Sequence, residues 1–320
     1  MNVLVFGGSK SGKSFFAQKI AQSLSKTFPL YYLATMVPHD AEDLLRIQKH
    51  LYSRRNMGFI TLEYGTNIEQ AFAQINPKGT VLLESVTALL TNEMFSVNGD
   101  IDYGARDRVI HSTQVLANYM KQGNVVFVCD SLFSDGIDYN FATRYFQSVF
   151  AECQRNIASF SDLVLEIFVS KYIIYKGKDS KLIKMLDKSL NNAAPQMNLQ
   201  SSIHLIIGGA FQGKTEYAIK KFNLQKGDIY ECKEDSAIDF SFKCFTHIER
   251  YIKYCLSNNI AEENVFPPNS VVICDDIFCG IVPIDSFERR WRERTGEYLQ
   301  RLSSNAQEVI RVSCGIGTVL

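Results

Sequence analysis

The chain has 320 residues, of which 46% are hydrophobic and 21% charged, and its formal net charge is zero. This balance excludes a general electrostatic affinity for nucleic acid or for an anionic membrane surface. No apolar run approaches the roughly 18 residues of a membrane-spanning helix, and the first residues read as a strand rather than a signal peptide. We therefore expect a cytoplasmic protein that is long enough for two domains.

The cysteine pattern agrees with that location. The eight cysteines are scattered and form no Cys-x-x-Cys pair. Cys129, Cys274 and Cys314 stand in apolar runs that read as strands. We expect them to be reduced, buried thiols.

A glycine-rich stretch opens the chain. Residues 7–14 read GGSKSGKS, between an apolar run at 2–6 and a helix-like run at 15–24. Strand, turn and helix in this order predict a phosphate-binding loop, whose glycines let backbone N–H groups converge on phosphate. Lys13 is expected to reach the β- and γ-phosphates and Ser14 to ligate Mg²⁺. The predicted nucleotide-binding residues of this first loop are Gly7, Gly8, Ser9, Lys10, Ser11, Gly12, Lys13 and Ser14.

Strands and helices then alternate, which predicts a parallel sheet with helices on both faces, an α/β fold like that of the P-loop NTPases. The predicted strands cover residues 30–35, 59–63, 80–84, 124–129 and 162–168. The predicted helices cover residues 40–50, 68–75, 86–94, 105–120 and 141–158.

Two residues outside the loop are candidates for the same site. Glu84 ends a buried strand, and ligand sites form at the carboxyl ends of parallel strands, so Glu84 is placed to hold Mg²⁺ or its waters. His50 ends the helix for which Asp40 is the expected N-cap, four residues after Arg46 and on the same side. Leu44, Leu45 and Ile47 mark an apolar face of that helix.

The pattern of strand, glycine-rich turn and helix recurs in the second half. Residues 208–215 read GGAFQGKT after an apolar run, so Gly208, Gly213, Lys214 and Thr215 repeat the nucleotide-binding roles of the first loop. The predicted strands that follow the run at 202–207 are 228–232, 270–274 and 308–313, and the predicted helices are 242–256 and 286–303. NVVFVCDSLF and SVVICDDIFC form a second matching pair of segments. These matches predict an internal duplication: domain 1–175, a polar, lysine-rich linker 176–200, and a shortened domain 201–320.

The order of several motifs resembles one family. GGSKSGKS, YYLAT, DAEDLLRIQKH and VLLESVTALLTN resemble the bifunctional adenosylcobinamide kinase/adenosylcobinamide-phosphate guanylyltransferases of cobalamin biosynthesis. The second half resembles the same family in VVICDDIFCGIVP and FERRWRERTGEYLQRLSSNAQEVIRVSCGI. The chain therefore looks like two copies of one domain, each degenerate in a different place.

The resemblance implies two reactions. A nucleoside triphosphate, ATP or GTP, phosphorylates adenosylcobinamide, and a histidine then takes GMP from GTP and passes it to the cobinamide phosphate. The matching histidine is His50, with Lys49 and Arg54 near enough in sequence to steady phosphate charge. A neutral imidazole suits this role because it is nucleophilic at pH 7. The loop itself reads phosphates and does not decide between ATP and GTP. The family also suggests a ring of subunits, part of which a fused pair would replace.

Both halves depart from the family pattern. The first half has Ser131-Leu132 where the family has Asn-Glu, and no proline follows Gly136-Ile137. The second half keeps Gly280-Ile281-Val282-Pro283, preceded by Asp275-Asp276, but has no counterpart of Arg46-Ile47-x-x-His50. We hypothesise a composite site of the first loop, Glu84 and His50, lined by residues 275–283.

Two alternatives stay open. The chain keeps only the kinase, which needs the loop, Mg²⁺ and an acceptor pocket but no histidine. Alternatively it is a diverged nucleotide-binding protein that regulates or scaffolds a partner, as two eroded copies would allow. Covalent labelling by α-labelled GTP separates the bifunctional enzyme from both alternatives, because neither a kinase alone nor a pure binder takes the label.

Overall fold

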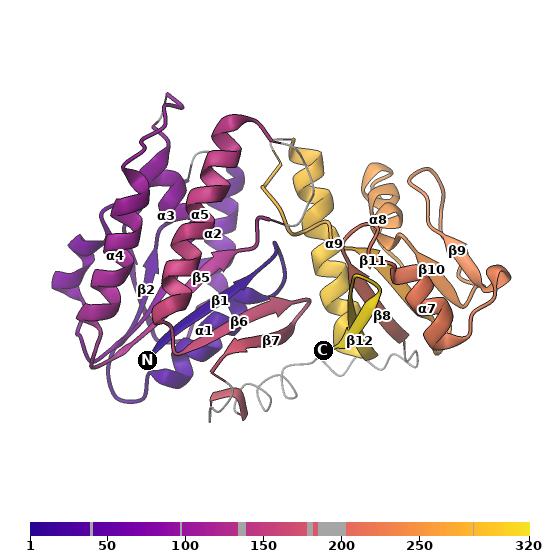
Figure 1. Cartoon of the computed structure of the whole chain (residues 1–320), viewed down its shortest axis with the longest axis horizontal. Coiled ribbons are helices and arrows are strands. Elements are labelled where there is room, and N and C mark those ends of the chain that lie inside the picture. Colours follow the sequence, from indigo (N-terminus) through magenta and orange to yellow (C-terminus); the bar gives the residue numbers. More distant parts are fainter. Residues whose placement is uncertain (39–40, 97, 134–138, 178–181, 185–202, 284) are drawn as a thin grey trace.

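The computed structural model describes residues 1–320 except 39–40, 97, 134–138, 178–181, 185–202 and 284 (Figure 1). Two sheets, each built from one half of the chain, lie at opposite ends of the molecule (Figure 1). Across the described ranges, no helix is both long enough and apolar enough to cross a bilayer.

The first sheet has the strand order β3-β2-β4-β5-β1-β6-β7, parallel except for the β6–β7 hairpin. Its strands are β1 (Asn2–Gly7), β2 (Leu30–Ala34), β3 (Phe59–Glu63), β4 (Thr80–Glu84), β5 (Asn124–Asp130), β6 (Leu163–Phe168) and β7 (Lys171–Lys176). Its helices are α1 (Lys13–Leu24), α2 (Ala41–Ser53), the 3₁₀ helix η1 (Ile68–Gln74), α3 (Val86–Met94), α4 (Ala105–Tyr119) and α5 (Phe141–Phe160).

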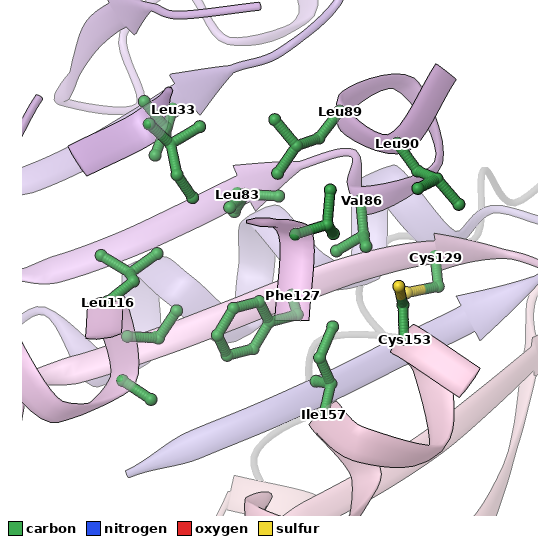
Figure 2. Close-up of a cluster of buried hydrophobic side chains, with 14 of the residues drawn as sticks. Leu33, Leu83, Val86, Leu89, Leu90, Leu116, Phe127, Cys129, Cys153 and Ile157 are labelled. Carbon is green, nitrogen blue, oxygen red and sulfur yellow. The ribbon is translucent and has the colours of Figure 1, made fainter. Parts of the chain in front are cut away.

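Apolar side chains leave both faces of this sheet, because successive residues of a strand point to opposite sides. Val3 and Val5 pack with α1, while Leu4 belongs to the cluster that meets α3, α4 and α5. Figure 2 shows that second cluster, with Phe127 of β5 among side chains from the sheet and from the helices. The predicted parallel sheet with helices on both faces is confirmed.

The second sheet has the order β13-β12-β8-β11-β10-β9, parallel except for β12–β13. Its strands are β8 (Ile203–Gly208), β9 (Ile229–Glu231), β10 (Cys244–Thr246), β11 (Val271–Asp275), β12 (Ala306–Ser313) and β13 (Ile316–Val319). Its helices are α7 (Lys214–Phe222), the 3₁₀ helix η2 (Lys226–Asp228), α8 (Ile248–Ser257) and α9 (Ser286–Asn305).

The two sheets share one topology, which supports the duplication. β8, β11, β12 and β13 take the places of β1, β5, β6 and β7, and β10 and β9 take those of β4 and β2. The second half has no counterpart of α2 and β3, because the described residues 232–243 between β9 and β10 form neither helix nor strand. Both long helices have the same kind of cap: Asn140 accepts from the Thr143 amide before α5, and Asp285 accepts from the Glu288 amide before α9.

Three expectations need correction. Residues 244–246 form strand β10 rather than the start of the helix predicted at 242–256, which begins at Ile248. Cys314 is exposed, because it lies in the β12–β13 turn, whereas Cys129 and Cys274 are buried. Leu44 and Leu45 of α2 are exposed, so the apolar face of this helix is not a core face.

The domain boundaries stay a prediction, because most of the predicted linker lies outside the described residues, as do Asp40 and Gly136-Ile137. The two halves nevertheless touch. The Ser9 amide donates to the carbonyl of Phe278 at 2.8 Å, and the Gly280 amide donates to the carbonyl of Ser131 at 3.0 Å. Phe168, at the end of β6, belongs to the apolar cluster of the second half.

Candidate active site

The first glycine-rich loop joins β1 to α1 in the conformation that a phosphate loop requires. Lys10 and Gly12 have positive φ angles, 52° and 97°. A Cβ atom on Gly7 would stand 2.3 Å from the carbonyl oxygen of Ile167, so only glycine fits beside β6 there. The Ser11 hydroxyl is buried without a hydrogen-bond partner among the described residues, as expected of a group that awaits a ligand.

Lys13 lies within the loop and closes it. Its Nζ donates to the carbonyl of Gly8 at 3.1 Å and pairs with Oδ1 of Asp130 at 2.8 Å. Burial alone would raise the pKa of Asp130, but the ammonium of Lys13 outweighs that effect and holds the pKa of this carboxyl below its usual value. The contacts with Gly8 and Asp130 therefore hold the ammonium group of Lys13 inside the loop.

Sequence reasoning missed Asp130 as a site residue. β5 follows β4 in the chain but lies next to β1, so the acid at its carboxyl end faces the loop. Asp130 shows the same pattern that indicated Glu84, because it too is an acid at the end of a buried strand.

Glu84 lies at the end of β4, across from the start of α1. Its Oε1 accepts a hydrogen bond from the hydroxyl of Ser14, and its Oε2 accepts one from Tyr32 at 3.1 Å. The two predicted magnesium ligands are thus in contact. A hydroxyl and a carboxylate are the oxygen donors that this hard cation prefers, so the residues present fit Mg²⁺.

His50 lies near the end of α2 and faces the same cavity. Burial lowers the pKa of its imidazole, Glu84 opposes that change, and the positive charges of Arg54, Lys10 and Arg46 lower the pKa further. The imidazole is therefore neutral at pH 7. The guanidinium of Arg54 lies 3.5 Å from the ring centre of Tyr32, and it also lines the cavity.

The cavity that these groups share has a volume of about 750 Å³, within the range of small-molecule sites. Of the predicted residues, the structure places in its lining Ser9, Lys10, Ser11, Gly12, Lys13, Ser14, His50 and Glu84. Gly7 and Gly8 shape the loop without lining the cavity. Gly208, Gly213, Lys214 and Thr215 lie in the loop of the other half.

The second half supplies one wall of this cavity. Phe278, Gly280, Val282 and Pro283 line it, which agrees with the hypothesis of a composite site. Arg289, Arg292, Glu293 and Gln300 of α9 line it too.

Helix α9 also contacts the loop directly. Lys10 pairs with Glu297 at 3.5 Å, and the Gln300 amide donates to the carbonyl of Lys10. Arg46 of α2 pairs with Glu293 at 3.4 Å. The long helix of one half thus packs over the first glycine-rich loop, in the other half (Figure 1).

Known proteins match the first half of the chain. A family model described as "Cobinamide kinase / cobinamide phosphate guanyltransferase" matches residues 3–170. Two relatives are named "Bifunctional adenosylcobalamin biosynthesis protein CobU". The one from Escherichia coli (strain K12) is 29% identical over 168 residues, covering 50% of this chain and 91% of its own. The one from Salmonella typhimurium (strain LT2) is 28% identical over 173 residues, covering 51% and 93%.

Among solved structures, an ATPase of the type III secretion system of pathogenic bacteria matches with a TM-score of 0.31 and 13% identity, over 52% of this chain and 50% of its own. That score is too low to bear on the fold. The matches to the family model and to both relatives cover about half of this chain and nearly all of each relative. The chain therefore belongs to the cobinamide kinase / cobinamide phosphate guanyltransferase family.

Proposed function

We propose that the chain carries out both reactions for which its family is named, at the cavity of the first loop. It phosphorylates adenosylcobinamide with a nucleoside triphosphate, and it transfers GMP from GTP to the product through His50, giving adenosylcobinamide-GDP. The observation that carries the proposal is that His50 and the phosphate loop line one cavity. A nucleotide held by the loop therefore lies within the same space as the nucleophile.

The kinase step needs positioning and charge rather than a covalent group on the protein. The loop amides and Lys13 would hold the β- and γ-phosphates, and the hydroxyl of the acceptor would attack the γ-phosphorus. The bond from that phosphorus to the bridging oxygen breaks, the nucleoside diphosphate leaves, and the proton of the hydroxyl passes to solvent water. Ser14 and Glu84 would hold the Mg²⁺ ion, which when bound neutralises phosphate charge.

The transfer step needs a nucleophile that is neutral at working pH. A ring nitrogen of His50 would attack the α-phosphorus of GTP, forming a P–N bond while the bond to the β-phosphate oxygen breaks and pyrophosphate leaves. A phosphate oxygen of the acceptor then attacks the same phosphorus, and the P–N bond breaks. The lowered pKa of His50 supports this role, because the imidazole is already unprotonated at pH 7.

The test is incubation of the purified chain with α-labelled GTP and Mg²⁺, followed by acid and base treatment of the protein. Wild type should carry an acid-labile, base-stable label, and His50→Ala should carry none while still binding nucleotide. His111→Ala is the matched control, because His111 lies exposed on α4 and should leave the label unchanged.

A label that survives in His50→Ala would overturn the assignment of the nucleophile. If the wild-type chain takes no label, the proposed GMP transfer through His50 is wrong. Transfer from γ-labelled ATP to adenosylcobinamide would then distinguish a chain that keeps the kinase alone from a nucleotide-binding regulator.

A further inference from the structure

The second glycine-rich loop has the same backbone shape as the first. It joins β8 to α7, and Phe211 and Gly213 have φ angles of 59° and 78°, at the positions of Lys10 and Gly12. A phenylalanine rarely adopts a positive φ angle. A loop that had lost its ligand would be free to relax, so the retained shape favours a working phosphate cradle.

Its lysine is held in the same way as that of the first loop. Lys214 Nζ donates to the carbonyl of Gly209 at 2.7 Å and pairs with Oδ1 of Asp275 at 2.7 Å. The side chain of Lys214 is only 7% exposed. A buried ammonium is expensive to keep unless it serves a ligand or a fixed ion pair, and here it lies inside a loop shaped for phosphate.

Next to this lysine is a group of side chains suited to a cation. His247 follows β10, with its Nδ1 3.1 Å from Oε1 of Glu249 and 3.9 Å from Oδ2 of Asp275. One ligand atom from each of the three residues lies within 4.8 Å of the others. β10 adjoins β11 as β4 adjoins β5, so the cluster occupies the side of the loop on which Glu84 stands in the first half.

We infer that the second loop binds a nucleoside triphosphate together with a divalent cation held by His247, Glu249 and Asp275. Backbone amides of residues 209–214 and Lys214 would take the phosphates, and Thr215 would share the cation. The loop, the buried lysine and the cation cluster are separate observations that converge on the same ligand. The inference is independent of the chemistry proposed for the first site.

The second site lacks the residue that the proposed GMP transfer requires. His50 stands on α2 in the first half, and the described residues 232–243 at the corresponding place in the second half form no helix. Among the described residues, the second site therefore has no counterpart of the proposed nucleophile on α2, and GMP transfer of the kind proposed for His50 is not expected there.

The experiment is equilibrium binding of non-hydrolysable GTP and ATP analogues to the full chain with Mg²⁺, measured by calorimetry. Wild type should bind a second equivalent that survives in Lys13→Ala and is lost in Lys214→Ala. Thr215→Ala, which leaves the Lys214–Asp275 ion pair in place, should weaken that equivalent by about tenfold through loss of a ligand to the cation. Lys220→Ala removes an exposed charge from the same helix and should change nothing.

The cation is tested with Mn²⁺ as a spin probe in the Lys13→Ala background. His247→Ala should weaken Mn²⁺ binding in the presence of the analogue by about tenfold. Loss of all binding in folded Lys13→Ala, or two equivalents in Lys214→Ala, would overturn the inference. Neither result depends on covalent labelling of His50, so failure here is distinct from failure of the proposed function.

Discussion

Asp276 is an acid in an environment that disfavours its charge. It follows Asp275 at the end of β11, it is buried, and its Oδ1 has no hydrogen-bond partner among the described residues. Burial raises its pKa to about 6, although Cys279 and Arg311 act in the opposite direction. A carboxyl of this kind makes the stability of the fold depend on pH.

We predict that Asp276→Asn stabilises the chain above pH 6. The carboxyl titrates near 3.8 when exposed and near 6 when folded, so the folded state holds the extra proton between these values. The free energy of unfolding of wild type therefore falls as pH rises through this window, by about 3 kcal/mol in all. Asparagine carries no charge, so the free energy of unfolding of the variant does not fall in this window.

Chemical denaturation of both proteins at pH 4.5 and 7.5 measures the effect. The advantage of the variant should be larger at pH 7.5 by about 2 kcal/mol, since most of the window lies between the two values. An advantage of the same size at both pH values would show that the carboxyl does not titrate as described.

Individual site residues were predictable where a motif places them. The first loop and Glu84 were predicted from the order of residues, and the role of His50 from the family resemblance; the structure brings these residues to one cavity. Asp130 and Arg292 were not identified, because their places depend on which strands and helices become neighbours. Arg292 stands some 280 positions after the loop that it faces across the cavity, so nothing local in the sequence could link the two.

Among the elements, α9 lies close to the backbone of the first loop. A Cβ atom on Gly296 would stand 2.8 Å from Cβ of Lys10 and 3.2 Å from the carbonyl oxygen of Ser9. Glycine in a helix interior is unfavourable by about 1 kcal/mol relative to alanine. Glycine is present at this position despite that cost, because any larger residue would hold α9 farther from the first loop.

We predict that Gly296→Ala weakens nucleotide binding at the first loop while changing stability little. The helix gains about 1 kcal/mol from alanine, and the clash removes a similar amount or more. To relieve the clash the backbone at Ser9 and Lys10 must shift, and those residues line the cavity.

Titration with a nucleotide analogue in the Lys214→Ala background measures this effect, with Ser304→Ala on an exposed position of α9 as the control. The affinity of Gly296→Ala should fall by about tenfold, which corresponds to roughly 1.4 kcal/mol. An unchanged affinity would mean that the contact between helix and loop does not shape the site.

Most elements were predictable because their patterns are long. The strands of the first sheet through β6 and the helices α3, α4, α5 and α9 agree with the predicted ranges to within a few residues. β10 is three residues long, too short to show an alternating pattern. The predicted range of the amphipathic helix that follows it therefore included these residues. Leu44 and Leu45 are apolar but exposed, and Leu44 borders the cavity rather than the core.

At the scale of the whole molecule, one ion pair joins the two sheets. Arg311 Nη1 lies 2.7 Å from Oε2 of Glu166, whose side chain is 5% exposed. Glu166 pairs in register with Phe6, and Arg311 pairs with Ile207, the residues directly before Gly7 and Gly208. The two partners therefore occupy equivalent positions in the two copies, and they have diverged to opposite charges.

We predict that Arg311→Met lowers the free energy of unfolding by about 3 kcal/mol, because it leaves a buried carboxylate without its partner. The double variant Glu166→Gln/Arg311→Met should recover most of that loss, since no uncompensated charge stays buried. Denaturant unfolding of the two single variants and the double variant forms a thermodynamic cycle that measures the coupling. Additive losses would show that the pair does not join the halves energetically.

The packing of α9 over the first loop does not depend on the concentration of the protein. Glu297 and Gln300 reach Lys10 from the same polypeptide, so the encounter between them is intramolecular. Its effective concentration is set by the covalent connection and stays constant when the protein is diluted. The wall that the second half gives to the cavity is therefore present in every single chain, however few chains a cell contains.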